Sequence, residues 1–394
     1  MPRLALAAAA TLLAAAALVL RAPDESNAAR TATVALFSRA LDGGTPNGPS
    51  TNAVISSDLR YAQIIAFESE ASDLVSGDDN QVKDVFAVRR AGSFGDTGSE
   101  WKPGRTQLVS QGLGGDPADG PSFDPAVDGG VHHRATCVAF LSNATNLVSG
   151  DTNGVTDAFL AKAPSFKPAR ISLPSNKQSG DATTAVAVSN DCSRTAFVTG
   201  GKLYVRGSST KALKTSGTPA DPEFATDETN DLVFGAKGGV YLSEGASRSP
   251  KLVAKGGSNP SYVNRKRGGS RVRMVVYEKK KGGHAQIAYR RIGGGEKYAT
   301  RNGNGDSRDP TIFNSGFNIG FESDASNLVS DRNGATDAYF FTSTKGMTIN
   351  ESGDFRTGGQ RPSTSYYRNY VVFDSSGNDR SKDPQVYLKY LGGI

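Results

Sequence analysis

The chain has 394 residues, a formal net charge of +6 and 37% hydrophobic residues. It contains 46 glycines, 13 tyrosines and 18 phenylalanines, a composition typical of many short strands joined by tight turns. No second long apolar run follows residue 20, which excludes a protein with several membrane-spanning helices.

The N-terminal segment has the pattern of an export signal. Arg3 precedes an apolar run over residues 4–20, and small residues follow at 26–29. This pattern predicts a signal peptide over residues 1–29, with a short membrane anchor as the alternative. We therefore expect an exported protein that is periplasmic, cell-wall associated or secreted. Residues 30–394 would form a single, monomeric domain without a transmembrane segment.

A recurring strand pair is the main organising pattern of the remaining chain. Each repeat has a β-rich strand with an aromatic residue, and a second aromatic strand follows it. The first aromatics are Phe67, Phe140, Phe197, Phe234, Tyr277, Phe321 and Phe373. The second are Phe86, Phe159, Tyr204, Tyr241, Tyr289, Tyr339 and Tyr387. Such periodic strands predict an all-β propeller of four-stranded blades, with seven blades favoured over six.

Other features of the repeat support this fold. A polar residue precedes proline ahead of five of the aromatic strands, at 124–125, 221–222, 259–260, 309–310 and 361–362. The last repeat lacks an outer strand, whereas residues 32–39 form an unassigned strand before the first repeat. We expect residues 32–39 to pair with residues 385–391 and close the ring, because open sheet edges invite aggregation.

These repeats resemble those of TolB-type, WD-like propellers. The most specific block is SEASDLVSGDDNQVKDVF at 69–86, which is nearly duplicated at 142–159 and 323–340. The resemblance covers nearly all of residues 30–394. It implies an exported bacterial propeller.

The duplicated block also carries regularly spaced oxygen ligands. They are Asp78, Asn80 and Asp84 in the first copy, Asp151, Asn153 and Asp157 in the second, and Asp331, Asn333 and Asp337 in the third. This spacing is similar to the first half of a calcium loop, although a bidentate Glu is missing. The alternative is an Asn/Asp turn that bonds to its own backbone. No other cofactor is predicted.

Basic residues are concentrated in one segment. Residues 264–301 contain twelve Lys or Arg and two Glu, a net charge of +10. Three clusters stand out: Arg265, Lys266 and Arg267; Lys279, Lys280 and Lys281; and Arg290 and Arg291. Because consecutive turns of a blade alternate between the two ends of the ring, the clusters need not share a face. They predict either a solvated rim or a site for an anionic partner.

Two further groups of residues have alternative interpretations. Export permits a disulfide between Cys137 and Cys192, which lie in successive repeats, but two separate buried thiols fit equally well. His132 and His133 lie in a turn, where a histidine pair is more often exposed than metal-bound. The chain has neither H-E-x-x-H nor G-x-S-x-G.

The sequence thus favours a binding or scaffolding module over an enzyme. We expect a protein or an anionic envelope polymer as the partner, and no nucleic acid. A propeller enzyme that acts on a glycan or peptide, and a calcium-stabilised structural protein, remain alternatives.

Overall fold

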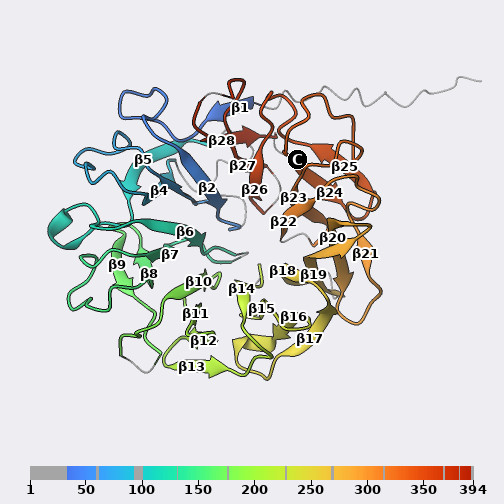
Figure 1. Cartoon of the computed structure of the whole chain (residues 1–394), viewed down its shortest axis with the longest axis horizontal. Coiled ribbons are helices and arrows are strands. Elements are labelled where there is room, and N and C mark those ends of the chain that lie inside the picture. The colour runs from blue at the N-terminus through green and yellow to red at the C-terminus, as the bar shows by residue number, and fades with distance from the viewer. Residues whose placement is uncertain are drawn as a thin grey trace, which may run out of the picture. The chain divides into compact units, whose positions relative to one another are not determined.

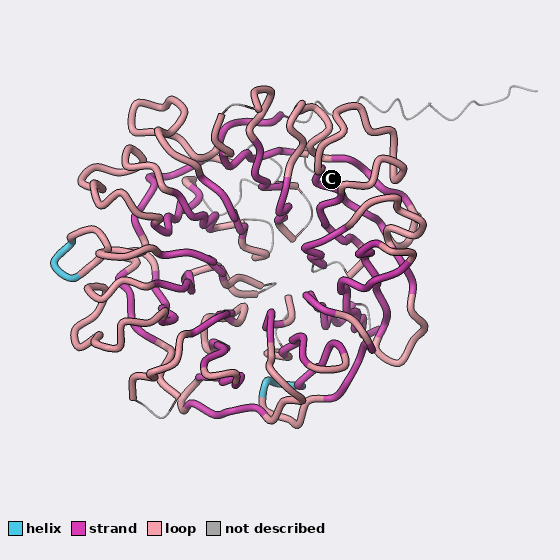
Figure 2. Tube along the Cα trace, in the orientation of Figure 1, coloured by secondary structure: helices cyan, strands magenta, loops and turns pink. Residues whose placement is uncertain are grey.

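A computed structural model describes residues 33–58, 62–92, 101–130, 132–174, 177–226, 229–267, 270–313, 316–366, 369–380 and 382–391. The predicted signal peptide lies outside these residues. Residues 32–394 form one compact unit of seven four-stranded antiparallel sheets, arranged as blades around a common axis (Figure 1). Loops and turns connect the strands (Figure 2). The only helices in the described residues are the 3-10 turns η1 (Leu113–Gly115) and η2 (Glu244–Ala246).

In blades 1 to 6 the strands follow one another in chain order from the axis outward, whereas the outer strand of blade 7 is the first strand of the chain. Blades 1 and 2 contain β2 (Ser50–Ile55), β3 (Ile64–Ser69), β4 (Asp84–Arg90), β5 (Pro103–Leu108), β6 (Ser122–Val127), β7 (Cys137–Ser142), β8 (Asp157–Lys162) and β9 (Lys167–Arg170). Blades 3 and 4 contain β10 (Thr183–Val188), β11 (Thr195–Thr199), β12 (Lys202–Arg206), β13 (Thr210–Leu213), β14 (Ala220–Phe224), β15 (Leu232–Ala236), β16 (Gly239–Ser243) and β17 (Lys251–Lys255).

Blades 5 to 7 complete the ring. Blade 5 contains β18 (Ser258–Arg267), β19 (Ser270–Lys281), β20 (His284–Arg291) and β21 (Lys297–Tyr298). Blades 6 and 7 contain β22 (Ser307–Ile312), β23 (Asn318–Ser323), β24 (Asp337–Thr342), β25 (Met347–Asn350), β26 (Gln360–Thr364), β27 (Tyr370–Ser375), β28 (Gln385–Tyr390) and β1 (Thr33–Leu36).

The first strand of the chain closes the ring, as predicted. β1 is the outer strand of blade 7 and pairs antiparallel with β28, with Thr33 opposite Tyr390 and Leu36 opposite Tyr387. Figure 1 shows blue β1 beside red β28. This pairing confirms the closure inferred from the sequence, and the seven sheets confirm the predicted number of blades.

The core lies between neighbouring blades and contains the aromatic residues of the repeat. In six blades the two repeat aromatics are direct cross-strand partners, as for Phe67 and Phe86, whose ring centroids lie 5.8 Å apart. In blade 5 the register differs, and Tyr289 pairs with Val276. Second strands such as β3, β7 and β27 are buried along their whole length, so both of their faces are covered, which explains why they are largely apolar.

The two ends of the ring differ in their connections. The turns between first and second strands and between third and fourth strands lie at one end, which we call the first-turn end. At the opposite end, the long-loop end, lie the connections between second and third strands, including the three duplicated loops. None of the helices in the described residues has the length and apolarity needed to cross a membrane.

Candidate functional site

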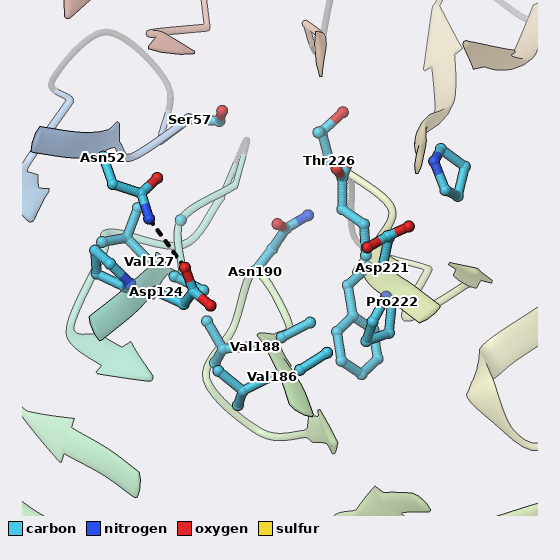
Figure 3. Close-up of a pocket in the computed structure, with 18 of the residues that line it drawn as sticks. Asn52, Ser57, Asp124, Val127, Val186, Val188, Asn190, Asp221, Pro222 and Thr226 are labelled. Carbon is cyan, nitrogen blue, oxygen red and sulfur yellow. Dashed lines mark hydrogen bonds between the residues drawn. The ribbon is translucent and has the colours of Figure 1, made fainter. Parts of the chain in front are cut away.

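The inner strands of blades 1 to 4 line a pocket of about 490 Å³, to which Asn259 and Pro260 of blade 5 also contribute. Figure 3 shows Asn52 and Asp124 on one side of this pocket and Asp221 on the other. Polar side chains from several inner strands therefore face a shared space near the axis.

A β-bulge at the start of the inner strands positions these side chains. The central residue of the bulge has a left-handed backbone conformation in six blades, at Asn52, Asp124, Asp221, Asn259, Asp309 and Arg361. In five of them proline follows, and its missing N–H suits an interruption of the strand ladder. The polar-residue–proline pattern in the sequence thus marks a bulge beside the channel.

Carboxylates of neighbouring blades accept hydrogen bonds from the N–H groups of these bulges. Glu68 accepts from the backbone N–H of Asp124 at 3.0 Å, and Asp374 accepts from that of Asn52 at 2.8 Å. Glu278 and Glu322 make the corresponding bonds to Asp309 and Arg361. These four bonds tie blade 7 to blade 1, blade 1 to blade 2, blade 5 to blade 6 and blade 6 to blade 7.

Burial raises the pKa of several carboxyl groups in this region. It raises the pKa of Asp124, and the neighbouring Glu68 carboxylate adds to the rise. Burial also raises the pKa of Asp221, to which Asp309 contributes. Asp374 has a pKa raised by burial to about 6, although the Arg361 guanidinium opposes the rise. The pocket offers carboxyl and amide oxygens as hydrogen-bond acceptors, which suit a ligand with donor groups.

The three duplicated loops form closed side-chain networks at the long-loop end. The side-chain nitrogen of Asn80 donates to Asp84 at 2.6 Å, and its oxygen accepts from the N–H of Val82. Asn153 and Asn333 bond to Asp157 and Asp337 in the same way. In each loop the amide nitrogen donates to the carboxylate, and the amide oxygen accepts from a backbone N–H two residues later. These are the bonds of an Asn turn, which the sequence offered as the alternative to a calcium loop.

A hydroxyl residue that the sequence analysis missed completes each network. Ser110 donates to Asp84 and accepts from the N–H of Val85, and Ser172 and Ser352 do the same in blades 2 and 6. Thr300 accepts the equivalent N–H bond in blade 5. The only sequence signal for these residues was a Ser or Thr within a few residues after the outer strands of these blades. Its separation along the chain from the Asp that it contacts is not the same in every blade.

The strand register divides the predicted basic residues between the two ends of the ring. Lys266 pairs with Arg271, and Met274 pairs with Arg291. This brings two of the three predicted clusters together at the first-turn end, with Arg271 and Arg273 beside them. Lys279, Lys280 and Lys281 lie at the opposite end of β19.

Few of the basic side chains at the first-turn end are neutralised. Lys266, Arg271 and Arg291 are exposed, and among the described residues none of them has an ion pair. At the long-loop end, by contrast, Lys279 pairs with Glu296 at 2.7 Å and Lys281 lies 4.0 Å from the ring centroid of Tyr298. The first-turn end of blade 5 is therefore the more available positive surface.

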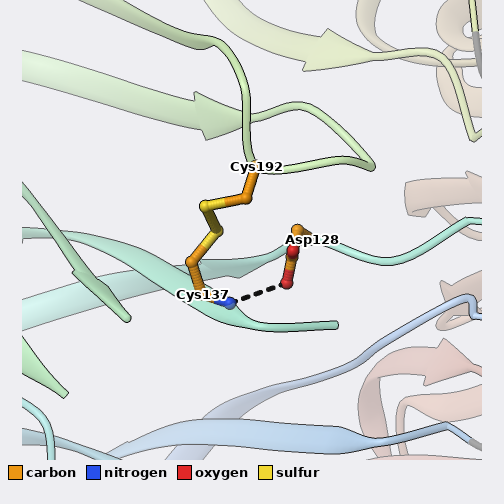
Figure 4. Close-up of side chains that lie close together, drawn as sticks. All are labelled: Asp128, Cys137 and Cys192. Atoms are coloured by element: carbon orange, nitrogen blue, oxygen red, sulfur yellow. Dashed lines mark hydrogen bonds between the residues drawn. A yellow bond between two sulfur atoms is a disulfide. The ribbon is translucent and has the colours of Figure 1, made fainter. Parts of the chain in front are cut away.

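A disulfide joins Cys137 and Cys192 across the interface of blades 2 and 3 (Figure 4). The buried apolar clusters at this interface are small. A carboxylate oxygen of Asp128 lies within 4.8 Å of both sulfurs. Bonded sulfurs are not the thiolates that bind metals, so this trio is not a metal site in the oxidised protein. His132 and His133 are exposed in the nearby turn.

No protein-family model and no curated protein matches this chain. Among solved structures it is similar to oligogalacturonate lyase from Vibrio parahaemolyticus, with 9% identity, 91% and 97% of the two chains covered, and a TM-score of 0.54. For acylaminoacyl peptidase from Pyrococcus horikoshii the identity is 10%, the coverage is 86% and 51%, and the TM-score is 0.51.

TolB structures are also among the matches. TolB from Acinetobacter baumannii is 16% identical, with a TM-score of 0.41, and the match spans 60% of each chain, less than two thirds of that protein's length. At such identities a likeness shows the fold alone. The seven four-stranded blades confirm the propeller fold that the TolB-type resemblance implied, and the chain is a seven-bladed β-propeller.

Proposed function

We propose that this protein is an exported binding module whose blade 5 attaches to an anionic envelope polymer. The observation that carries the proposal is the strand register of blade 5, which gathers basic residues of β18, β19 and β20 at one end of the ring. A concentrated positive surface attracts polyanions and accelerates their association.

The structure offers this surface in a form suited to binding. Lys266, Arg271 and Arg291 are exposed, and they lie on the ends of adjacent, paired strands. A rigid sheet holds charges at fixed spacing, so less conformational entropy is lost on binding than with a flexible tail. A long polymer could then contact several charges at once.

Export is part of the same proposal. The signal peptide at residues 1–29 would direct the domain at residues 30–394 out of the cytoplasm. The disulfide between Cys137 and Cys192 is consistent with an oxidising compartment, because cytosolic thiols are usually kept reduced. Mass spectrometry of the exported protein should find a new N-terminus near Ala29 and no free thiol.

Charge reversal at each end of blade 5 tests the binding function. K266E/R291E should abolish most binding to an acidic polysaccharide such as alginate, whereas K279E/K281E at the long-loop end should retain it. Wild-type binding should also weaken steeply with salt, since the attraction is screened. Equal binding by all three proteins, or wild-type binding to neutral dextran, would refute the proposal.

A further inference from the structure

A second cavity, of about 540 Å³, lies between blades 4 and 5, and Arg194 of blade 3 also lines it. Its other arginines are Arg248, just after η2, and Arg271 and Arg273, at the start of β19. These positions belong to turns and strand ends at the first-turn end. The cavity therefore lies beside the basic surface described above, but it is formed mainly by other residues.

The charges around this cavity do not cancel. Four guanidinium groups face two carboxylates, those of Asp231 and Glu244. Glu244 bonds to Arg273 at 2.6 Å and to Arg248 at 3.0 Å, and these cations hold its pKa below the usual value. Arg194 and Arg271 have no carboxylate partner among the described residues.

Asp231 does not compensate Arg194 or Arg271, because its oxygens serve other donors. This buried carboxylate accepts from the N–H of Gly245 at 2.8 Å and from the side-chain nitrogen of Asn264 at 2.6 Å. The cavity therefore has more positive charge than its own acids neutralise.

Two of the arginines are held in place before any ligand arrives. The oxygen of Asn264 accepts from Nε of Arg271 at 2.6 Å, and its nitrogen is bound to Asp231, so the amide aligns the guanidinium. The hydroxyl of Tyr262 accepts from Nε of Arg273 at 3.0 Å. The two terminal nitrogens of Arg271 remain available. Together they form the planar guanidinium fork that binds carboxylates and phosphates in a bidentate manner.

We propose that this cavity, lined by Arg194, Arg248, Arg271 and Arg273, binds an oxyanion group, either a carboxylate or a phosphate. The exposed basic surface of blade 5 would attract the anionic polymer, and the cavity would hold one of its charged groups. That the polymer supplies this oxyanion rests on the proposed function, whereas binding of a free oxyanion to the cavity does not.

Thermal stabilisation by small anions tests the cavity directly. Inorganic phosphate and glucuronate should each be titrated into the purified protein at constant ionic strength, with chloride as the reference. A bound anion stabilises the folded state increasingly as its concentration exceeds its Kd, so Tm should rise with at least one of them. The anion that raises it identifies whether phosphate or carboxylate is preferred.

Variants then locate the effect. R194A and R271A should each weaken anion binding ~10-fold or more, since each removes charge-assisted hydrogen bonds. R271K keeps the charge but loses the fork, and it should also weaken binding. The matched control is R105A, which removes an exposed arginine from β5 in blade 1 and should leave binding unchanged.

The two proposals can fail separately. If neither anion raises Tm, or if R194A and R271A bind it as well as R105A does, the cavity proposal is wrong even if K266E/R291E abolishes polymer binding. If the anion binds and the arginine variants lose it while alginate does not bind wild type, the cavity is an oxyanion site and the polymer function fails.

Discussion

The first and second duplicated loops have nearly the same sequence but differ in how their buried charge is balanced. In blade 2, Arg170 on β9 contacts Asp151 at 2.9 Å and Asp157 at 3.2 Å. In blade 1 the residue opposite the strand aromatic is Leu108 instead, and Asp78 has a buried oxygen without a partner among the described residues. A single position on the outer strand therefore decides whether the loop's carboxylates have a cation.

The third loop shows another solution. Asn350 occupies the position of Arg170 and donates to Asp337 at 2.6 Å, while Asp331 accepts from the backbone N–H of Asn333. Near-identical loops can therefore differ in electrostatics, because the compensating residue lies outside the repeated block. Four experiments test whether this electrostatic difference between the loops is real.

The largest effect should come from removing the cation of blade 2. R170A leaves the buried Asp157 and Asp151 without their guanidinium, which should lower the free energy of unfolding by about 3 kcal/mol. Denaturant unfolding would measure the change. K167A, an exposed lysine on the same strand, is the control; an equal loss in both variants would show that the pairing contributes nothing.

The next effect should be a dependence on pH in blade 1. Burial raises the pKa of Asp78 to about 7 and that of Asp84 to about 6. A carboxyl whose pKa is higher in the folded state stabilises the protein while protonated, and this contribution disappears as pH rises from about 4 to about 7. D78N removes one such group. Between pH 5 and pH 8 the unfolding free energy of D78N should therefore fall by about 2 kcal/mol less than that of wild type.

The measurement compares unfolding free energies of D78N and wild type at both pH values. D151N is the matched variant in blade 2, where Arg170 partly opposes the effect of burial on the pKa of Asp151. If the unfolding free energies of D78N and wild type changed equally with pH, Asp78 would not be a buried carboxyl with a raised pKa.

A smaller effect should appear when the cation of blade 2 is transplanted to blade 1. L108R would place a guanidinium opposite Phe86, as Arg170 stands opposite Phe159. It should stabilise the wild-type chain more than it stabilises the D78N variant, giving a coupling energy of ~1 kcal/mol in a double-mutant cycle. A coupling energy of zero would show that a cation at position 108 does not interact with Asp78.

The smallest effect should be that of calcium. Each loop amide donates its nitrogen to the carboxylate that would bind the ion, and in blade 2 a guanidinium already neutralises the site. Millimolar calcium should therefore shift Tm by less than about 1 °C. A larger shift that EDTA reverses would favour the calcium interpretation of these loops.

The fold could be predicted from sequence because its signals are local and repeated. The aromatic pairs that define the strands, such as Phe140 and Phe159, lie within one blade and are direct neighbours. The closing strand was recognisable because the last repeat lacked one and residues 32–39 had no repeat of their own. Each inference needed only the spacing along the chain and the requirement that sheet edges be paired.

The sites were less predictable because they depend on register and on contacts between blades. The basic clusters were visible in sequence, but only the pairings of Lys266 with Arg271 and of Met274 with Arg291 show which of them share an end. The cavity combines Arg194 with Arg271, which lie in different blades. Ser110 and its counterparts were missed because hydroxyl residues are common after strands and become specific only beside their Asp partner.

Because β1 pairs with β28, the fold does not depend on which blade the chain starts from. Thr33 and Tyr390 are adjacent in one sheet, so a short linker between them would make the backbone circular. New termini could then be opened between other blades without removing any strand from its sheet. The same architecture could thus accommodate a circular permutant that starts at blade 2 and keeps all seven interfaces.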